Sequence, residues 1–322
     1  MREGKHVKRT IGWTLVALLL GAAVGVTAQT PLTVLDIDPG VAELGAGGAG
    51  ISIVNGAETL YYNPAGLADL PGISFSSFYA SYFGVANYSA FALAFRNFAG
   101  AVLLLNSGGI QGYDDEGALD GTIAYGNTAF LLGAGLTPSD FSFFPDLGFA
   151  FSLGARVRVI TAKIDDERGT GFGFDLGFRS ELADISLGGF SLADTAIGVD
   201  LVNLFGALNY DTVQETLQMD MQVGASSLIA GLVRASLDVH LSGGLHFGLA
   251  YAAAPTFTIR LGVISRGTLS ITAGVGINVQ GFLLDYAFVS HTLGGSHRVS
   301  LTLDFSALDM RALSSSLRRL LP

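Results

Sequence analysis

Strict alternation of apolar and polar residues in the last third of the chain constrains its fold more than any other feature. Between residues 297 and 305 every second residue is apolar, namely Val299, Leu301, Leu303 and Phe305. Residues 231–240 and 267–279 repeat the pattern. Because side chains two positions apart lie on one face of a β-strand, each segment predicts a strand with one apolar face and one polar face.

The chain is apolar overall, yet no part of it beyond residue 28 has the pattern of a transmembrane helix. Hydrophobic residues make up 50% of the sequence and the mean hydropathy is +0.50, but Ser, Tyr, Asn and Gly interrupt the apolar stretches with a period of two. In lipid, only helices and closed barrels satisfy all their backbone hydrogen-bonding groups. The sequence therefore predicts an all-β fold, an antiparallel transmembrane β-barrel.

We predict fourteen strands in this barrel, at residues 72–83, 88–96, 99–107, 122–136, 146–163, 171–182, 193–205, 217–228, 231–240, 244–252, 256–266, 267–279, 281–290 and 297–306. Their number is even, and they average about ten residues, the length of a tilted strand that crosses a bilayer. A soluble β-sandwich would also alternate. The acidic, glycine-rich loops predicted at 107–121, 164–170 and 205–216 all fall on one side, as the long outer loops of outer-membrane barrels do.

Residues 1–28 have the layout of a secretory signal peptide. Basic residues precede an uncharged apolar run at residues 11–26, and Val26 and Ala28 supply the small residues for cleavage before Gln29. An uncleaved membrane anchor is the alternative, although the run is shorter than the about 20 residues that span a bilayer. The chain is therefore predicted to leave the cytoplasm.

Charge and motif content exclude several classes of function. The formal net charge is −10, and Lys163 is the one lysine beyond residue 28, which argues against a nucleic-acid partner. The chain has no cysteine, hence no disulfide framework. It also lacks a G-x-S-x-G elbow and an H-E-x-x-H motif. We predict no catalytic residue, metal site or cofactor, and no enzyme activity.

Residues 29–70 differ from the rest because they are rich in glycine and poor in strand patterns. Residues 45–50 match G-x-G-x-x-G by letter, but the β-branched residues 51–54 and the Asn55-Gly56 turn signal follow instead of a helix, which argues against a dinucleotide site. Small residues suit close packing of chain inside a narrow lumen. We therefore predict a plug at 29–70, a barrel at 71–306 and a periplasmic tail at 307–322. The tail is predicted either as a short amphipathic helix or as a frayed terminus.

The plug ends with the segment Tyr61-Tyr62-Asn63-Pro64-Ala65-Gly66-Leu67-Ala68. Pro64 fixes its own φ and lacks a donor, and an Asn before it can hold a tight turn through its side chain. This segment, together with the Gly-rich residues 45–50 before it and the last hairpin at 281–300, resembles the outer-membrane long-chain fatty acid transporter (FadL-like) family. The likeness covers nearly the whole chain beyond residue 28 and is closest to the smaller, PorV-like branch.

The resemblance implies a barrel closed by an N-terminal hatch whose tip is formed by Asn63, Pro64 and Ala65. It implies passive uptake of hydrophobic, fatty-acid-like molecules through a hatch-gated lumen in the cell outer membrane. The PorV-like branch also includes subunits of a protein-secretion machine, so a scaffold that transports nothing is the alternative. The implied partners are outer-membrane lipid, hydrophobic small molecules, the barrel-assembly machinery and, for a scaffold, secretion-system proteins. A hatch that moves and a fixed plug both remain open.

The alternation also places charged side chains inside the barrel. Eight are predicted to point inward: Arg156, Arg158, Arg234, Asp238, Arg260, Asp285, Arg298 and Asp304. Charges there are tolerated where they are wet or paired. We predict that they pair with acidic residues of the plug such as Asp36, Asp38, Glu43 or Glu58, with a solvated lumen as the alternative.

Overall fold

The structure is a computed structural model that describes residues 34–308 apart from 83, 115, 139–140, 142–148, 166, 188–189, 211–213 and 293. The predicted signal peptide and residues 309–322 of the predicted tail lie outside the described residues. Among the residues described, no helix is long and apolar enough to cross a membrane.

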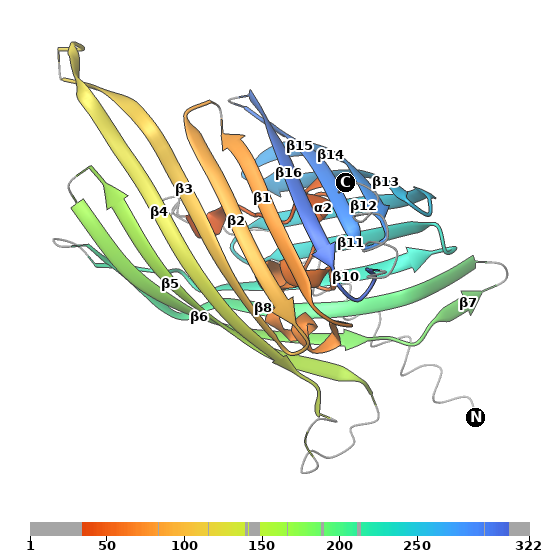
Figure 1. Cartoon of the computed structure of the whole chain (residues 1–322). Helices are drawn as coiled ribbons and strands as arrows, with labels where there is room; N and C mark the ends of the chain where they lie inside the picture. The colour runs from red at the N-terminus through yellow and green to blue at the C-terminus, as the bar shows by residue number, and fades with distance from the viewer. Residues whose placement is uncertain are drawn as a thin grey trace, which may run out of the picture.

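A closed antiparallel barrel of fourteen strands forms the body of the molecule (Figure 1). The strands pair in chain order, β8 pairs with β10, and β16 returns to β1. The wall strands are β1 (Ser74–Tyr82), β2 (Ala86–Phe95), β3 (Phe98–Tyr113), β4 (Leu119–Leu136), β5 (Phe151–Ile164), β6 (Glu167–Glu181), β8 (Phe190–Tyr210), β10 (Asp220–Ile229), β11 (Val233–His240), β12 (Gly244–Ala254), β13 (Phe257–Arg266), β14 (Thr268–Val279), β15 (Phe282–His291) and β16 (Gly294–Asp304). Two three-residue strands, β7 (Ile185–Leu187) and β9 (Gln214–Thr216), pair with β8. The predicted fold class and strand number are confirmed.

One flank of the wall is much taller than the other. Strands β3, β4 and β8 have 16, 18 and 21 residues, whereas β10 and β11 have 10 and 8. The predictions of open loops at 107–121, 164–170 and 205–216 are therefore wrong, because strand pairing continues through most of them. Two paired strands can extend beyond the bilayer because each provides hydrogen-bond partners for the backbone of the other. In β3 the pairing shifts register between Ser107 and Ile110, where Gly109 has a φ of 136°. We call this end of the barrel the long-hairpin end.

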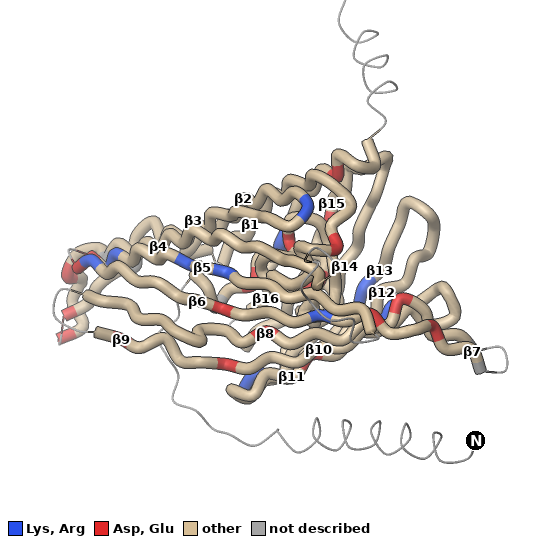
Figure 2. The backbone as a smooth tube through the Cα atoms, turned by 90° about the horizontal axis from the view of Figure 1, so that it is seen from below, with Lys and Arg blue, Asp and Glu red and all other residues tan. Residues whose placement is uncertain are grey.

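The outer face of the wall is apolar, as the alternation predicts. Leu301 is 40% exposed and its neighbour Thr302 only 5%, while Ile271 is 60% exposed and Thr272 is fully buried. Figure 2 shows acidic and basic positions gathered at the tips of the long strands, with most of the wall uncharged. An apolar band that surrounds a polar interior is the arrangement of a transmembrane barrel.

Residues 34–70, which we call the N-terminal segment, lie inside the barrel (Figure 1). The segment consists of short turns of helix: η1 (Val34–Asp36), α2 (Val41–Gly45), η2 (Gly56–Glu58), α3 (Thr59–Tyr62) and η3 (Pro64–Asp69). Wall residues on opposite sides of the barrel reach it. Tyr88 of β2 donates a hydrogen bond to the Ile37 carbonyl at 2.9 Å, and Asp238 of β11 accepts one from the Ile51 amide at 3.0 Å. Its apolar residues pack against alanines that line the inner face of β2 and β3.

Candidate functional site

The inner wall carries a belt of glycines where the N-terminal segment touches it. Four pairs of these glycines face each other across neighbouring strands: Gly135 with Gly154, Gly154 with Gly177, Gly198 with Gly224 and Gly248 with Gly262. A Cβ atom on Gly135 would lie 2.6 Å from the Pro64 carbonyl oxygen, and one on Gly224 would lie 2.7 Å from the Ile51 Cβ. Because such distances are shorter than van der Waals contact, any side chain in the belt would push the segment off the wall.

Asn63, Pro64 and Ala65 form a buried corner of the segment against β5, β6 and β8. The Asn63 side chain accepts a hydrogen bond from the Ala65 amide at 3.0 Å and so caps η3, whose first residue is Pro64. Its amide group donates to the Ile51 carbonyl within the segment and to the Phe178 carbonyl of β6, both at 2.9 Å. The corner therefore joins two parts of the segment to the wall.

A buried cluster of two arginines and two aspartates stands beside this corner. Arg156 contacts Asp175 at 2.6 Å and Asp200 at 2.9 Å, and Arg158 contacts Asp175 at 2.5 Å. Arg156 also donates to the carbonyls of Leu60 and Tyr61, at 2.6 and 2.8 Å. Charges balance within the cluster, as buried charges require. Since α3 ends at these carbonyls, Arg156 ties the last turn of α3 to β5, β6 and β8.

The wall itself is interrupted next to this cluster. Phe174 of β6 pairs with Phe205 of β8, and Leu176 pairs with Leu201, so three residues of β8 lie opposite Asp175 alone. Within this bulge Asn203 has a φ of 54°, and its backbone amide donates a hydrogen bond to the Asp175 carboxylate at 2.7 Å. Regular pairing between the two strands therefore gives way to side-chain contacts at this point.

Arg298 and Asp238 also contact the segment from the wall. Arg298 donates to the Asp38 carbonyl at 2.9 Å and to the Tyr82 hydroxyl, and Asp238 holds the Ile51 amide. Both side chains are buried.

Within the described residues, no hydrogen bond or ion pair joins the other predicted lumen charges to the segment. Arg260 and Asp285 pair with each other at 2.6 Å across β14. Arg234 pairs with the exposed Asp194 at 3.3 Å. Asp304 bonds to Ser306 in the turn after β16.

The contacts between wall and segment differ in kind from those predicted. The arginines bind backbone carbonyls, whereas Asp38 accepts from Tyr62 at 2.6 Å and Glu43 accepts from Asn55 at 2.9 Å. The Asp36 side chain lies outside what the structure describes. An ion pair that does join wall and segment links Arg179 to Asp69 at 2.6 Å. Sequence reasoning missed Asp175, Arg179 and Asp200, although each is a charge inside a predicted membrane strand, which is itself the signal of a buried pair.

Buried carboxyl groups concentrate within the segment. Burial raises the pKa of Asp38 to about 7, against the hydrogen bonds from Tyr62 and Gly40. Burial, and then the nearby Glu43 carboxyl, raise the pKa of Glu58 well above its usual range, and burial also raises that of Glu43. Asn55 lies between these two glutamates, at 2.9 and 3.4 Å. Burial in the segment therefore favours the protonated form of these carboxyl groups.

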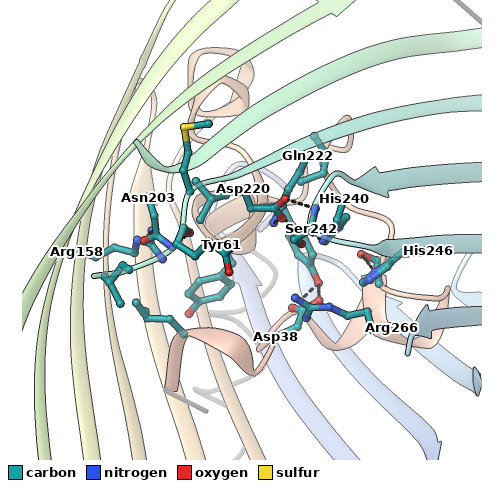
Figure 3. Close-up of a pocket in the computed structure, with 18 of the residues that line it drawn as sticks. Asp38, Tyr61, Arg158, Asn203, Asp220, Gln222, His240, Ser242, His246 and Arg266 are labelled. Carbon is teal, nitrogen blue, oxygen red and sulfur yellow. Dashed lines mark hydrogen bonds and ion pairs between the residues drawn. The ribbon is translucent and has the colours of Figure 1, made fainter. Parts of the chain in front are cut away.

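A cavity of about 680 Å³ lies between the segment and strands β8 to β13, at the long-hairpin end (Figure 3). Tyr61, Tyr62 and Asp38 border it from the segment. From the wall come Arg158, Arg266 and two stacked imidazoles, His240 and His246, whose ring centroids are 4.4 Å apart. Its volume falls within the about 300–1,000 Å³ of typical small-molecule pockets.

A second cavity of about 280 Å³ lies on the other side of the segment. Ala42, Ala46 and Ile53 of the segment border it, opposite Ser236, Ala250 and Arg260 of the wall. No group of three or more His, Asp or Glu residues in the described part of the chain is arranged to hold a metal ion.

The sequence matches no protein-family model and no curated protein sequence. The structure does match solved ones. The Ralstonia pickettii toluene transporter TbuX superposes with a TM-score of 0.55 and 14% identity, over 82% of this chain and 96% of that one. The monoaromatic hydrocarbon channel CymD gives 0.52 and 12%, over 82% and 96%. The Pseudomonas putida toluene transporter TodX gives 0.50 and 10%, over 87% and 98%.

These similarities define a class by fold: a fourteen-stranded antiparallel β-barrel like those of these transporters and channels. Within that class, the chain has the fold of the FadL-like transporters, and the resemblance seen in the sequence is confirmed at the level of fold. The relatives compared are transporters and channels rather than enzymes.

Proposed function

We propose that this protein is a channel for passive uptake of hydrophobic small molecules across the outer membrane, with residues 29–70 acting as its hatch. The observation that carries the proposal is the cavity of about 680 Å³ inside the barrel, which the N-terminal segment borders. The fold supports it, because TbuX and TodX are toluene transporters and CymD is a monoaromatic hydrocarbon channel. Aromatic hydrocarbons and fatty-acid-like molecules are the two substrate classes to compare.

The proposed orientation places the long-hairpin end outside the cell. Outer-membrane barrels carry their longer connections on the extracellular side and short turns in the periplasm. A solute from outside would then meet the larger cavity first and the smaller cavity after passing the segment. The signal peptide at 1–28 and a periplasmic tail at 307–322 belong to the same proposal.

A scaffold of the protein-secretion type is the second candidate. One observation favours it: Arg156, Arg179 and Arg298 all hold the segment by hydrogen bonds to its backbone. A segment fixed in this way would suit a protein whose lumen is permanently closed.

Uptake by intact cells distinguishes the two. A lipopolysaccharide leaflet slows hydrophobic solutes, so Gram-negative cells that make the protein should take up labelled toluene or labelled fatty acid faster than cells without it. A variant lacking residues 34–70 should be at least as fast, and gel mobility with and without heating shows whether its barrel has folded. If neither protein speeds uptake of either solute while both barrels are folded, the channel proposal fails and the scaffold is favoured.

A further inference from the structure

We propose that the solute crosses the N-terminal segment at residues 46–53, along the wall formed by β11, β12 and β13, rather than past Asn63, Pro64 and Ala65. We call residues 46–53 the glycine loop. This inference rests on the proposed channel function and specifies its path. It makes the glycine loop the moving part of the hatch, and it makes Asp238, His246 and Thr272 the wall residues that hold the loop closed.

The two cavities lie one after the other along the same three strands. On the inner face of β11, His240 borders the larger cavity and Ser236 the smaller one, with Asp238 between them. On β12, His246 and Ala250 border the two cavities and Gly248 lies between. On β13, Arg266 borders the larger cavity and Arg260 the smaller one, and Gly262 lies between them. The cavities are therefore separated at a single level of the wall.

The chain that fills this level is the glycine loop. The Ile51 amide donates to Asp238 at 3.0 Å, and the backbone of Ala46 and Gly47 packs directly on Gly248 and Gly262. Gly48 and Ile51, in the middle of the loop, border the larger cavity, and Ala46 and Ile53, at its ends, border the smaller one. The loop therefore lies between the two cavities.

The wall holds this loop with few bonds. Apart from Asp238, Thr272 accepts from the Gly47 amide at 3.0 Å, and the His246 ring lies 3.2 Å from the Gly48 carbonyl oxygen. At the C-terminal end of the loop, Arg179 of β6 donates to the Ser52 carbonyl at 2.9 Å. Gly47 and Gly48 have φ values of 75° and 72°, a conformation that glycine adopts without strain. Residues 46–50 carry no side chain larger than a methyl group, so this part of the loop can leave the wall without withdrawing a large group from a packed site.

The corner at Asn63 offers no such path. Neither cavity includes Asn63, Pro64 or Ala65 in its lining. The Arg156 guanidinium donates to the carbonyls of Leu60 and Tyr61 just before the corner, and Arg179 forms an ion pair with Asp69 just after it. Charge-assisted hydrogen bonds of this kind are about twice as strong as neutral ones.

Reversible cross-links test the path, since the chain has no cysteine of its own. Ile51→Cys with Gly224→Cys would tie the glycine loop to β10. A Cβ on Gly224 would lie 2.7 Å from the Ile51 Cβ. The loop would therefore shift by about 1 Å to reach the Cβ–Cβ distance of about 3.5–4.5 Å in a disulfide. Ala68→Cys with Gly135→Cys is the matched control, because a Cβ on Gly135 lies 2.7 Å from the Ala68 amide nitrogen beyond the corner.

Uptake of labelled toluene by intact cells is measured for wild type and both pairs, oxidised and then reduced. In the variant with the first cysteine pair, we expect oxidation to abolish protein-dependent uptake and reduction to restore it. The variant with the second pair should behave as wild type in both states. The inference is overturned if oxidation of the second pair blocks uptake, or if oxidation of the first does not. If wild type itself shows no protein-dependent uptake, the proposed function fails, and the inference fails with it.

A single substitution that frees the glycine loop tests the same path if the protein with the first cysteine pair does not fold. Asp238→Ala removes the bond to the Ile51 amide, so we expect faster toluene uptake than wild type at equal amounts of folded barrel. Unchanged or slower uptake by the folded variant contradicts the inference.

Discussion

The N-terminal segment meets the barrel wall in two ways, and the difference separates a fixed flank from a movable one. Around Asn63, arginines of β5 and β6 bind backbone carbonyls and aspartates within a buried, charge-balanced cluster. Around the glycine loop, the wall offers mainly glycines. Asp238 and Thr272 accept hydrogen bonds from loop amides, His246 lies beside the Gly48 carbonyl, and Arg179 holds the Ser52 carbonyl at the end of the loop. Both flanks allow the backbone to pack closely. Because the buried ion-pair cluster lies on one flank, the proposed hatch could stay attached there while residues 46–50 open.

The largest effect is expected from Arg156→Ala on the fixed flank. The substitution leaves Asp175 and Asp200 buried with fewer partners and frees the end of α3, so the barrel should lose about 3–5 kcal/mol of unfolding free energy. Urea unfolding of the protein in lipid vesicles measures this. Arg234→Ala is the matched control, because its ion pair with Asp194 is exposed and should change stability by less than about 1 kcal/mol. Equal losses in the two variants would show that the buried cluster is not an anchor.

Glycine belt substitutions should act differently on the two flanks. Gly154→Ala forces a methyl group into the corner at Ala65, where the chain is held, and should cost about 1–3 kcal/mol. Gly248→Ala meets the glycine loop at Ala46, which can move away. We expect a smaller loss of stability and faster toluene uptake. A loss at Gly248→Ala as large as at Gly154→Ala, with unchanged uptake, would remove the distinction between the flanks.

Asn63→Ala should loosen the fixed flank by a smaller amount. It removes the cap of η3 and leaves the buried Ile51 and Phe178 carbonyls without their donor, a loss of about 1–3 kcal/mol. Asn63→Asp retains the acceptor for the Ala65 amide but not the donors, so it separates the two contributions. If both variants unfold at the urea concentration of wild type, Asn63 does not hold the corner.

Packing around Asp38 is expected to depend on pH. A carboxyl whose pKa rises from 3.8 to about 7 on packing binds a proton more tightly in the packed state. Its packing is therefore most favourable below about pH 4, weakens as the pH rises to about 7, and stays constant above. Burial raises this pKa; among the titratable or charged neighbours, Tyr62 and Arg298 lower it and Glu43 raises it. Limited proteolysis of the segment should quicken from pH 4 to 7 in wild type and show a shallower slope in Asp38→Asn.

The alternation of residues was enough to predict the barrel. A period of two assigns each side chain to a face, and the faces of Leu301 and Thr302 follow from it directly. It does not say which strands are neighbours in register, so it could place Arg156 in the lumen but could not find Asp175 and Asp200 as its partners.

Two further features depend on tertiary structure. The bulge at Asn203 arises because the Asp175 side chain replaces regular pairing, which no local pattern reports. The long hairpins were missed because glycine-rich, acidic segments are typical of loops, whereas here each is held in extended form by its partner strand. The glycines of the belt are visible in the sequence, but they align only once the strand register is known.

Hydrogen–deuterium exchange of the protein in lipid vesicles tests most directly whether the two flanks differ. We predict that peptides covering residues 46–53 exchange faster than peptides covering residues 60–68, because local opening frees the Gly47 and Ile51 amides while the corner at Asn63 stays bonded. Equal protection of the two peptides, or faster exchange at residues 60–68, would contradict the assignment of a fixed flank and a movable one.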